Sequence, residues 1–464
     1  MSYNQNRKDD SGRAEVKRKD LDPQNLKKLA ESLVAYGRAD GADEVEVTLV
    51  DGYEFNVDVR LQQIENLVEA GSRYLSLRVI KDKKIAYAGS SDLSQGTLKY
   101  LLKNAIKRAV LANSDKFAGL PPPSPKKIDV SSLSLYDPEI PSLTSKKKID
   151  LALETEKIAL LDKRITNSHG ASFVTNEVKI ILANSYGFLE EFDQTFCSLS
   201  VGLQAGETDN LVEDFWGSAE RHLKDLESPE EIAKKAVERT VRQLNPKKIR
   251  TQKVSVIFEP TMTSWLLGFL FACVSGVSIY HRASFLVDKL GERIGNEKIT
   301  IYDDGLMPGR LGTKPFDSEG VPSQKTVVVE HGILKNYLCN TYAARKLNLR
   351  STGNADGAGV SPNNFYLEAG TGSPQEIIRS TEKGLLLVRT LGHGLNPITG
   401  DISRGAFGLW IEKGEIVHPV SEVTISGNLG EILRSADLVG NDLEFRGSIC
   451  GPTIKVAELM VAGE

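Results

Sequence analysis

A long, mostly apolar run without any Asp, Glu, Lys or Arg extends from Pro260 to His281. About 20 apolar residues are enough to cross a bilayer, so length alone would allow a membrane span. Threonine, serine and glycine interrupt the run, however, and it directly follows the buried-strand pattern KVSVIFEP. A strand that leads straight into an apolar helix is typical of a soluble core. We therefore predict a buried core helix here rather than a membrane span.

The start of the chain carries a helical pattern. Leu26, Leu29 and Leu33 recur at the spacing of one helix face. Asp22 and Pro23 stand just before this pattern, where an N-cap and a first-turn proline are favourable. The sequence therefore predicts a helix that begins at residue 22 or 23.

Strand patterns follow this helix. Apolar and polar residues alternate over 45–60, on both sides of Asp51-Gly52, which predicts a hairpin with its turn at these two residues. Two more strands are predicted at 73–80 and 84–90. A second helix is expected to begin at Ser94. This part of the chain thus reads as helix, antiparallel sheet, helix.

The middle of the chain begins with a proline-rich linker at 120–127, which is expected to be stiff and extended. A helix around 146–161 and a hairpin over Asn184–Gly187 follow. Ser228 precedes a proline and stands three residues before Glu231, which is the spacing of a helix capping box. The pattern therefore predicts another mixed α and β segment.

The last part of the chain is rich in strand patterns. Two similar hairpins are predicted at 327–338 and 409–420, each with the order apolar strand, Glu, any residue, Gly, apolar strand. A common tight turn explains this similarity, and an old duplication within the domain remains the alternative. The fold class is therefore predicted as α+β, with sandwich-like N-terminal units of antiparallel sheet and helices and a strand-rich C-terminal domain.

The predicted division has four parts. A polar, disordered tail covers 1–22, an N-terminal α+β domain 23–120, a middle α+β domain 121–250, and the strand-rich domain 251–464. The tail has no apolar core, so we do not interpret it as a signal peptide. A chain of 464 residues is expected to form two or three domains.

Charge and cysteine usage narrow the possible functions. The net charge is -4 and the pI is about 6.0, which argues against binding to nucleic acid. The cysteines are far apart and form no CxxC pair, as expected of reduced thiols in a cytosolic protein. They are Cys197, Cys273, Cys339 and Cys450.

No local motif for metal or nucleophilic catalysis occurs in the sequence. The two closest histidines, His393 and His418, are 25 positions apart, so there is no HExxH-like zinc motif. A site assembled from distant residues remains open. The chain also lacks a GxSxG elbow and a phosphate-binding P-loop.

The segment 391–415 combines a cluster of polar side chains with glycines at 392, 394, 400, 405 and 408. Two interpretations stay open: an irregular loop whose polar groups satisfy the backbone, or an edge that pairs with an extended peptide. The candidate peptide-binding residues of the second interpretation are His393, Asn396, Thr399, Asp401, Ser403 and Arg404.

Several blocks, in order along the chain, resemble the TldD/PmbA family and within it the PmbA (TldE) branch. The most specific are LGERIGNEKITIYDDG, PFDSEGVPSQKTVVVEHGILKNYLCNTYAARKL and GHGLNPITGDISRGAFGLWIEKGEIVHPVSEVTISGNLGEIL. Shorter blocks are VDVRLQQIENL, NSYGF and VGNDL. The resemblance covers nearly everything after residue 22.

The resemblance also gives a meaning to the uncharged run. In the TldD branch, the helix before the GERI-type block carries an H-E-x-x-x-H zinc motif, whereas this chain has WLLGFLFACVSG there. That branch has a further zinc ligand in a G-x-C-G-K segment near its C-terminus. Here Cys450 and Gly451 are present, but Pro452 stands in place of the lysine. The run therefore resembles an apolar counterpart of a metal-binding helix.

The family resemblance implies the non-zinc subunit of a heteromeric, cytosolic metalloprotease that acts on unfolded peptides or peptide precursors. A TldD-like partner would hold the zinc, while this chain binds no cofactor, no nucleic acid and no membrane. In isolation the chain is expected to form a homodimer. A stand-alone peptide-binding or scaffold protein is the main alternative, and an active zinc peptidase with an unrecognised site is a third.

Overall fold

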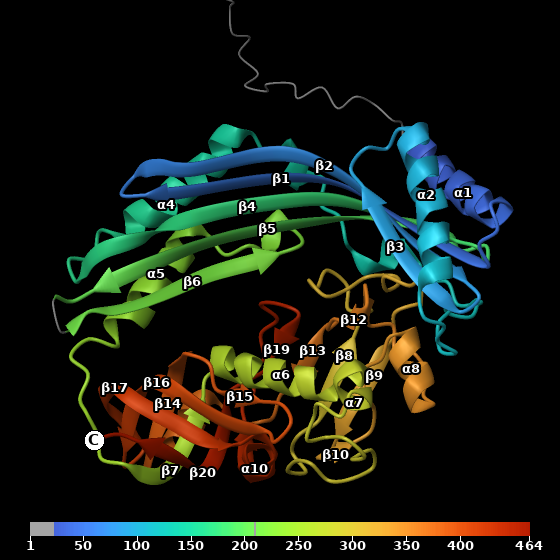
Figure 1. The fold of residues 1–464 in the computed structure, drawn as a ribbon. Coiled ribbons are helices and arrows are strands. Elements are labelled where there is room, and N and C mark those ends of the chain that lie inside the picture. The colour runs from blue at the N-terminus through green and yellow to red at the C-terminus, as the bar shows by residue number, and fades with distance from the viewer. Residues whose placement is uncertain (1–22, 208–209) are drawn as a thin grey trace, which may run out of the picture.

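A long, curved antiparallel sheet dominates the N-terminal half of the computed structural model, which describes residues 23–207 and 210–464 (Figure 1). The C-terminal half lies beneath the concave face of this sheet. In spatial order the strands are β3 (Lys84–Ser90), β2 (Gln63–Lys81), β1 (Glu44–Arg60), β4 (Ile165–Asn184), β5 (Leu189–Ala205) and β6 (Val212–Glu220). The predicted α+β class is confirmed.

The hairpin predicted at Asp51-Gly52 is wrong, because β1 continues through these residues without a turn. Asp51 pairs with Arg73 of β2 on one side and with Lys179 of β4 on the other. The alternation of buried residues keeps the same phase before and after this point, so one strand buries one face throughout. The turn lies instead at residues 61–62, both of which have positive φ.

Helices cover the convex face of the sheet at its two ends (Figure 1). The helix α1 (Pro23–Ala39) and α2 (Gln95–Leu111) pack at one end, and α4 (Ser145–Ala159) and α5 (Pro229–Val241) at the other. All four predicted helices are confirmed, as is the capping box of α5. The predicted N-cap Asp22 lies outside the described residues.

One sheet spans both N-terminal segments, because β1 pairs with β4 over most of its length. The proline-rich stretch at 120–127 contains no helix or strand and connects α2 to the short helix α3 (Glu139–Ser142). The predicted hairpin over Asn184–Gly187 is confirmed as the β4–β5 connection. The two segments thus build a single layer.

A small closed barrel forms much of the C-terminal half. Its strands follow the order β14-β7-β20-β17-β16, and β16 also pairs with β14, which closes the ring. The strands are β14 (Lys383–Leu391), β7 (Gln252–Phe258), β20 (Ile454–Ala462), β17 (Glu415–Asn428) and β16 (Asp401–Glu412), with β15 (Leu395–Asn396) and β18 (Ala436–Val439) added outside the ring.

A second, smaller sheet lies beside the barrel. Its strands are β10 (Ile333–Leu334), β9 (Lys325–Glu330), β8 (Ile301–Asp304), β13 (Phe365–Leu367) and β19 (Ile449–Cys450), and β11 (Ala355–Asp356) pairs with β12 (Gly359–Val360) nearby. The short helices of this half are α7 (Gly276–Tyr280), α8 (Thr341–Leu347), α9 (Pro374–Arg379) and α10 (Leu429–Ser435).

The two similar hairpins of the sequence are both present, one in each of these sheets. His331 and Gly332 have φ of 47° and 78°, and Lys413 and Gly414 have φ of 53° and 79°. Two consecutive residues with positive φ are the mark of a type I′ turn, which matches the twist of a two-stranded hairpin. The prediction of tight turns is therefore confirmed.

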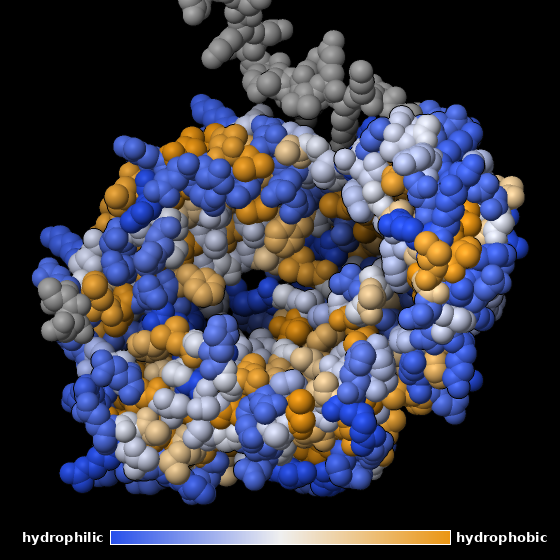
Figure 2. All heavy atoms as spheres, in the orientation of Figure 1, coloured by the Kyte–Doolittle hydropathy of each residue, from blue (hydrophilic) through white to orange (hydrophobic). Residues whose placement is uncertain are grey.

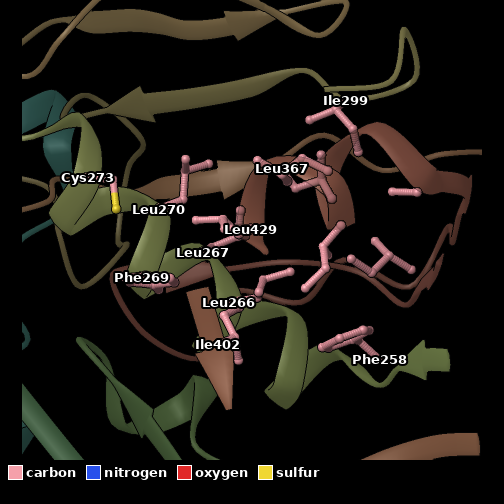
Figure 3. Packing of buried hydrophobic residues seen from close by; sticks show 14 of the residues in the cluster. Phe258, Leu266, Leu267, Phe269, Leu270, Cys273, Ile299, Leu367, Ile402 and Leu429 are labelled. Atoms are coloured by element: carbon pink, nitrogen blue, oxygen red, sulfur yellow. The ribbon is translucent and has the colours of Figure 1, made fainter. Parts of the chain in front are cut away.

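The uncharged run forms α6 (Pro260–Val274), which follows β7 directly, and then the short helix α7. Leu266, Leu267, Leu270 and Cys273 are buried in the largest core cluster, together with residues of the barrel and the second sheet (Figure 3). The predicted core helix is thus confirmed. Among the described residues, no helix has both the length and the apolar character needed to cross a membrane.

Candidate functional site

A hollow lies between the concave face of the long sheet and the C-terminal half (Figure 2). The helix α6 lies on top of the C-terminal half, below the sheet (Figure 1). One side of α6 keeps partial exposure at Thr261, Ser264, Trp265 and Gly268, and Ala272 is exposed. These positions recur every three or four residues, so they share one helix face. We call this set the open face of α6.

The open face of α6 offers hydroxyl groups, an indole and a methyl group, but no ionisable side chain. Ser264 Oγ donates to the Pro260 carbonyl at 2.8 Å and accepts from the Gly451 amide at 3.2 Å. Zinc in proteins prefers thiolate, imidazole or carboxylate ligands, so this donor set does not fit the metal. Across the described residues, no three or more His, Cys, Asp and Glu side chains are grouped to hold an ion.

Cys450, which the family resemblance relates to a zinc-ligand position, directly precedes Gly451, whose amide donates to Ser264 of the open face. Its side chain is buried, and Sγ donates to the Gly447 carbonyl at 3.3 Å. Burial raises the pKa of this thiol, so the thiolate that zinc requires is disfavoured. Cys450 therefore behaves as a small core residue.

The structure divides the segment 391–415 into a short irregular part and a regular part. Residues 392–400 contain a bend before β15 and a turn after it, while Asp401 begins the long strand β16. The interpretation of the whole segment as an irregular loop is therefore wrong for its second half. Glycine at 405 and 408 lies within the strand, where Gly408 allows close approach of Leu385 and the Leu386 carbonyl.

Arg404 is the candidate residue that reaches α6. Its guanidinium carbon lies 5.3 Å from the centre of the Trp265 ring, within the range of a cation–π contact. Arg404 Nε also donates to the Leu391 carbonyl at 3.1 Å, which fixes the direction of the side chain. The barrel strand β16 and the open face of α6 thus share one surface, which the sequence alone did not indicate.

Three other candidate residues hold the turn before β16. Asn396 Oδ1 accepts from the Ile398 amide at 3.0 Å, and Asp401 accepts from Thr399 Oγ1 at 2.6 Å. Asn428 Nδ2 donates to Asp401 at 3.0 Å. The bond from Thr399, followed by the one from Asn428, holds the pKa of Asp401 below its usual value. Asn396, Thr399 and Asp401 therefore already have partners within the turn.

His393 and Ser403 are exposed, and the structure does not bring them into that turn network. The Ser403 backbone amide donates to the Gly394 carbonyl at 2.8 Å, which places the two residues on neighbouring chain segments. Barrel closure also occupies both edges of β16 from 405 to 412, because β14 pairs on one side and β17 on the other. Peptide binding at the candidate residues stays a prediction, and it would use side chains rather than a free edge of β16.

The concave face of the long sheet contributes residues that sequence reasoning missed. A cavity of about 390 Å³ is lined by Asn176 and Val178 of β4, Gln194 and Phe196 of β5, and Arg221. It also touches the C-terminal half. In the sequence, these residues stand two positions apart on each strand, so they share one face of it. Only the register of β4 and β5 shows that the side chains of the two strands meet.

Arg221 joins this cavity to the C-terminal half. Its guanidinium donates to Gln194 Oε1 at 3.0 Å within the sheet and to the Leu311 carbonyl at 2.7 Å across the hollow. Burial lowers the pKa of Arg221 to about 10, which still leaves the group charged at neutral pH. The side chain therefore links the long sheet to the C-terminal half.

A larger cavity of about 790 Å³ opens at the N-terminal end of α6. Its walls carry Trp216, with the guanidinium of Arg446 4.2 Å from the ring centre and that of Arg239 at 5.2 Å. Arg239 pairs with Glu259 at 2.7 Å, and Arg446 pairs with Glu227. Ion pairs thus surround one aromatic side chain here.

Models of the three domains of PmbA/TldA metallopeptidases match this chain in order. Domain 1 matches residues 45–110, the central domain residues 138–244, and the C-terminal domain residues 251–463. The chain belongs to the PmbA/TldD family. The matches to this family include β1 and β4 of the long sheet, the helix α6 and the barrel.

Relatives that match over nearly the whole chain carry the name of one branch of the PmbA/TldD family. Metalloprotease PmbA from Escherichia coli O157:H7 is 35% identical over 433 residues, which is 93% of this chain and 94% of that protein. A metalloprotease PmbA homolog from Haemophilus influenzae is 34% identical over 428 residues, or 92% and 93% of the two chains. The chain is therefore a homologue of PmbA metalloproteases.

Solved structures share the complete fold. A protein from Thermotoga maritima MSB8, described as a proposed modulator of DNA gyrase, matches with a TM-score of 0.86 and 28% identity over 94% of this chain and 100% of that chain. A similarly described protein from Bacteroides thetaiotaomicron VPI-5482 matches with 0.88 and 27%, over 96% and 100%. TldE from Thermococcus kodakarensis shares the fold with a TM-score of 0.81 and 24% identity, over 94% and 100%.

Proposed function

We propose that this PmbA/TldD family chain is the non-zinc subunit of a two-subunit peptidase in the cytoplasm. A TldD-like subunit would hold the zinc, and this chain would supply one wall of the cleft that receives an unfolded peptide. The observation that carries the proposal is the open face of α6, which presents Thr261, Ser264, Trp265, Gly268 and Ala272 but neither a metal ligand nor a base.

The side chains of this chain give a chemical reason for dependence on a partner. Hydrolysis of a peptide bond at neutral pH needs an activated water or an activated nucleophile. Burial raises the pKa of the Cys197, Cys273 and Cys339 thiols to about 12, so these groups stay protonated and unreactive. Cys450 is buried as well. We therefore expect no hydrolysis by this chain alone.

The shape of the hollow suits an extended chain of variable sequence. Its upper wall carries amide and aliphatic side chains such as Asn176, Val178 and Gln194, while its lower wall carries the indole of Trp265 beside Arg404. Amide groups pair with peptide backbone, and aliphatic and aromatic surface accepts many side chains. This mixture supports weak sequence preference and an unfolded substrate.

Reconstitution tests the proposal. The purified chain and the TldD-like subunit of the same organism are mixed, their combined mass is measured by light scattering, and cleavage of an unstructured peptide is followed. We expect a stable complex that cleaves the peptide, and no cleavage by this chain alone. Cleavage by this chain alone, or failure of the two subunits to associate, would refute the proposal. The second result would favour a stand-alone peptide-binding or scaffold protein.

Variants of the lower wall refine the test. We expect Arg404→Ala and Trp265→Ala to lower peptide turnover by the complex, and His393→Ala to lower it without a change in melting temperature. Arg350→Ala is the matched control, because Arg350 is exposed and lies after α8, away from the α6 surface. Equal turnover in all four variants would show that this wall does not contact the peptide.

A further inference from the structure

A cavity of about 790 Å³ lies between β9 and the segment that follows α8, in the C-terminal half (Figure 1). None of the described residues that line it belongs to the long sheet, to α6 or to the barrel. The cavity is therefore separate from the hollow and from the open face of α6. We call it the β9 cavity. Its lining residues are Leu290, 324–327, 335–337 and 348–352.

Positive charge predominates in the β9 cavity. Its described lining carries Lys325, Lys335 and Arg350 but no carboxylate. Lys335 pairs with Glu330 at 3.1 Å. Lys325 Nζ lies 4.0 Å from the centre of the Tyr302 ring, and neither Lys325 nor the exposed Arg350 forms an ion pair with any residue that the structure describes. Two of the three positive charges are thus available to an anion.

Thr326 adds an unused hydroxyl group to this lining. Its side chain is buried, with 7% exposed, yet Oγ1 has no hydrogen-bond partner among the described residues. A buried hydroxyl group without a partner costs free energy, because it has lost its bonds to water. A ligand that brings an acceptor to Thr326 would remove this cost.

The β9 cavity follows a strand edge. Residues 324–327 all line it, although the side chains of a strand alternate between its two faces, so the cavity runs along the edge and not over one face. β8 pairs with 325–327 on one side, whereas β10 pairs only with the last two residues of β9. Asn336 Nδ2 donates to the Val327 carbonyl at 2.8 Å, so a side-chain amide already pairs with this main chain. An extended peptide uses such an edge in the same way.

We propose that the β9 cavity binds an extended peptide segment that carries acidic side chains. Lys325 and Arg350 would pair with its carboxylates, because bonds between charged groups are the strong ones, and Thr326 Oγ1 would donate to it. Leu290 and Leu349, each 38% exposed, would contact its apolar parts. This site goes beyond the proposed function, since it lies outside the hollow.

A single phosphate group fits the β9 cavity less well. Phosphate sites commonly use the N-terminal end of a helix, where amide groups point at the anion. Here α8 ends at Leu347, and its C-cap Asn348 lines the cavity, so the carbonyl end of the helix is present instead. That end disfavours concentrated negative charge. Carboxylates on separate side chains spread the charge, and each reaches its own cation.

Binding to the purified full-length chain tests the proposal. The probe is a fluorescein-labelled peptide of alternating glutamate and serine, followed by fluorescence anisotropy at low salt, where charge pairs are least screened. We expect Lys325→Gln/Arg350→Gln to weaken the affinity by about tenfold or more. Lys103→Gln/Lys107→Gln is the control, because it removes the same charge from exposed positions of α2, and it should bind as the wild type does.

Thr326→Val tests the buried hydroxyl group separately. We expect it to weaken the affinity by about two- to tenfold without lowering the melting temperature, because Oγ1 has no partner to lose in the free chain. No binding by the wild type, equal binding of a peptide of alternating lysine and serine, or an unchanged affinity in the double variant would overturn the proposal. Displacement by free glutarate or inorganic phosphate as effective as that by the unlabelled acidic peptide would also overturn it, in favour of a small-anion site. None of these measurements needs peptidase activity, so they leave the proposed function untouched.

Discussion

Leu270 lies fully buried on α6, in the cluster that also contains Phe258 and Leu429 (Figure 3). Replacement by alanine removes apolar contacts and leaves a cavity that a packed core fills only in part. We expect Leu270→Ala to lower the free energy of unfolding by about 2–5 kcal/mol, measured by urea denaturation. Leu111→Ala removes the same atoms from an exposed position and should change the free energy of unfolding by less than about 0.5 kcal/mol. Similar effects of both changes would contradict the core assignment.

Glu46 makes stability depend on pH. It is buried 2.8 Å from the Arg78 guanidinium, which also pairs with Glu319. Burial raises the pKa of Glu46 from 4.5 to about 7, although Arg78 opposes the shift. An acid whose pKa is higher in the folded state contributes stability at low pH, and loses it as the pH rises from about 4.5 through 7. The same direction holds for Asp317, whose pKa burial raises to about 7.

We therefore expect the melting temperature to fall between pH 5 and pH 8, and the fall to be smaller in Glu46→Gln, which has no carboxyl group to ionise. Over this range, the free energy of unfolding of the wild type should fall by about 1–3 kcal/mol more than that of Glu46→Gln. Thermal unfolding followed by circular dichroism at several pH values measures it. Glu65→Gln, an exposed position, should parallel the wild type. Parallel curves for Glu46→Gln would show that Glu46 is ionised throughout.

At the scale of elements, the side chains of α6 bear on whether this chain can bind zinc. The helix buries Leu266, Leu267, Leu270 and Cys273, and its partly exposed positions carry only uncharged side chains. Because its donor set does not fit zinc, we expect the purified chain to hold far less than one zinc ion after dialysis. Elemental analysis measures this, with the TldD-like subunit as the parallel sample. About one zinc per chain, or loss of fold on addition of a chelator, would contradict the prediction.

At the scale of the whole molecule, polar side chains join the N-terminal half to the C-terminal half. Arg345 of α8 donates to the carbonyls of Phe117, Gly119 and Leu120 at 3.0, 2.8 and 2.6 Å. These residues follow α2, so the bonds tie the N-terminal half to α8. Hydrogen bonds from a charged donor contribute about 1.5–3 kcal/mol each when they are buried, and less when they are partly exposed.

We expect Arg345→Met to lower the melting temperature and to increase cleavage by trypsin within 116–127, because the segment loses its anchor to α8. The matched control is Arg350→Met, which removes an exposed arginine of the same chain region. Limited proteolysis with mass spectrometry locates the cuts. Unchanged cleavage in Arg345→Met would show that other contacts, such as Tyr342 with Asp115, hold the segment by themselves.

Local elements were predictable where the signal is local. The capping box at Ser228, the turns at Gly332 and Gly414, and the core helix α6 all follow from neighbouring residues along the chain. The hairpin at Asp51-Gly52 failed because a turn-forming pair was taken as a turn, although the alternation kept its phase and pairing on both sides overrode the local preference.

The candidate site was predictable only in part, because contacts between residues far apart in the sequence do not show in the local pattern. Arg404 was singled out as one of several polar residues, but its contact with Trp265 joins a barrel strand to a helix that is far away in sequence. Asn396, Thr399 and Asp401 were singled out for the same composition, yet they bond to one another and to their own turn. Composition does not distinguish a residue that faces a hollow from one that satisfies a turn.

The sequence by itself determined the fold class, most helices and strands, and the family, because these depend on periodicity, caps and ordered blocks of residues. Only the tertiary structure decided that β1 and β4 join two segments into one sheet and that β16 closes the barrel. Strand partners are chosen by long-range contacts, and loop closure between distant residues leaves little trace in the local pattern. The hollow and the closed barrel are therefore properties of the folded chain.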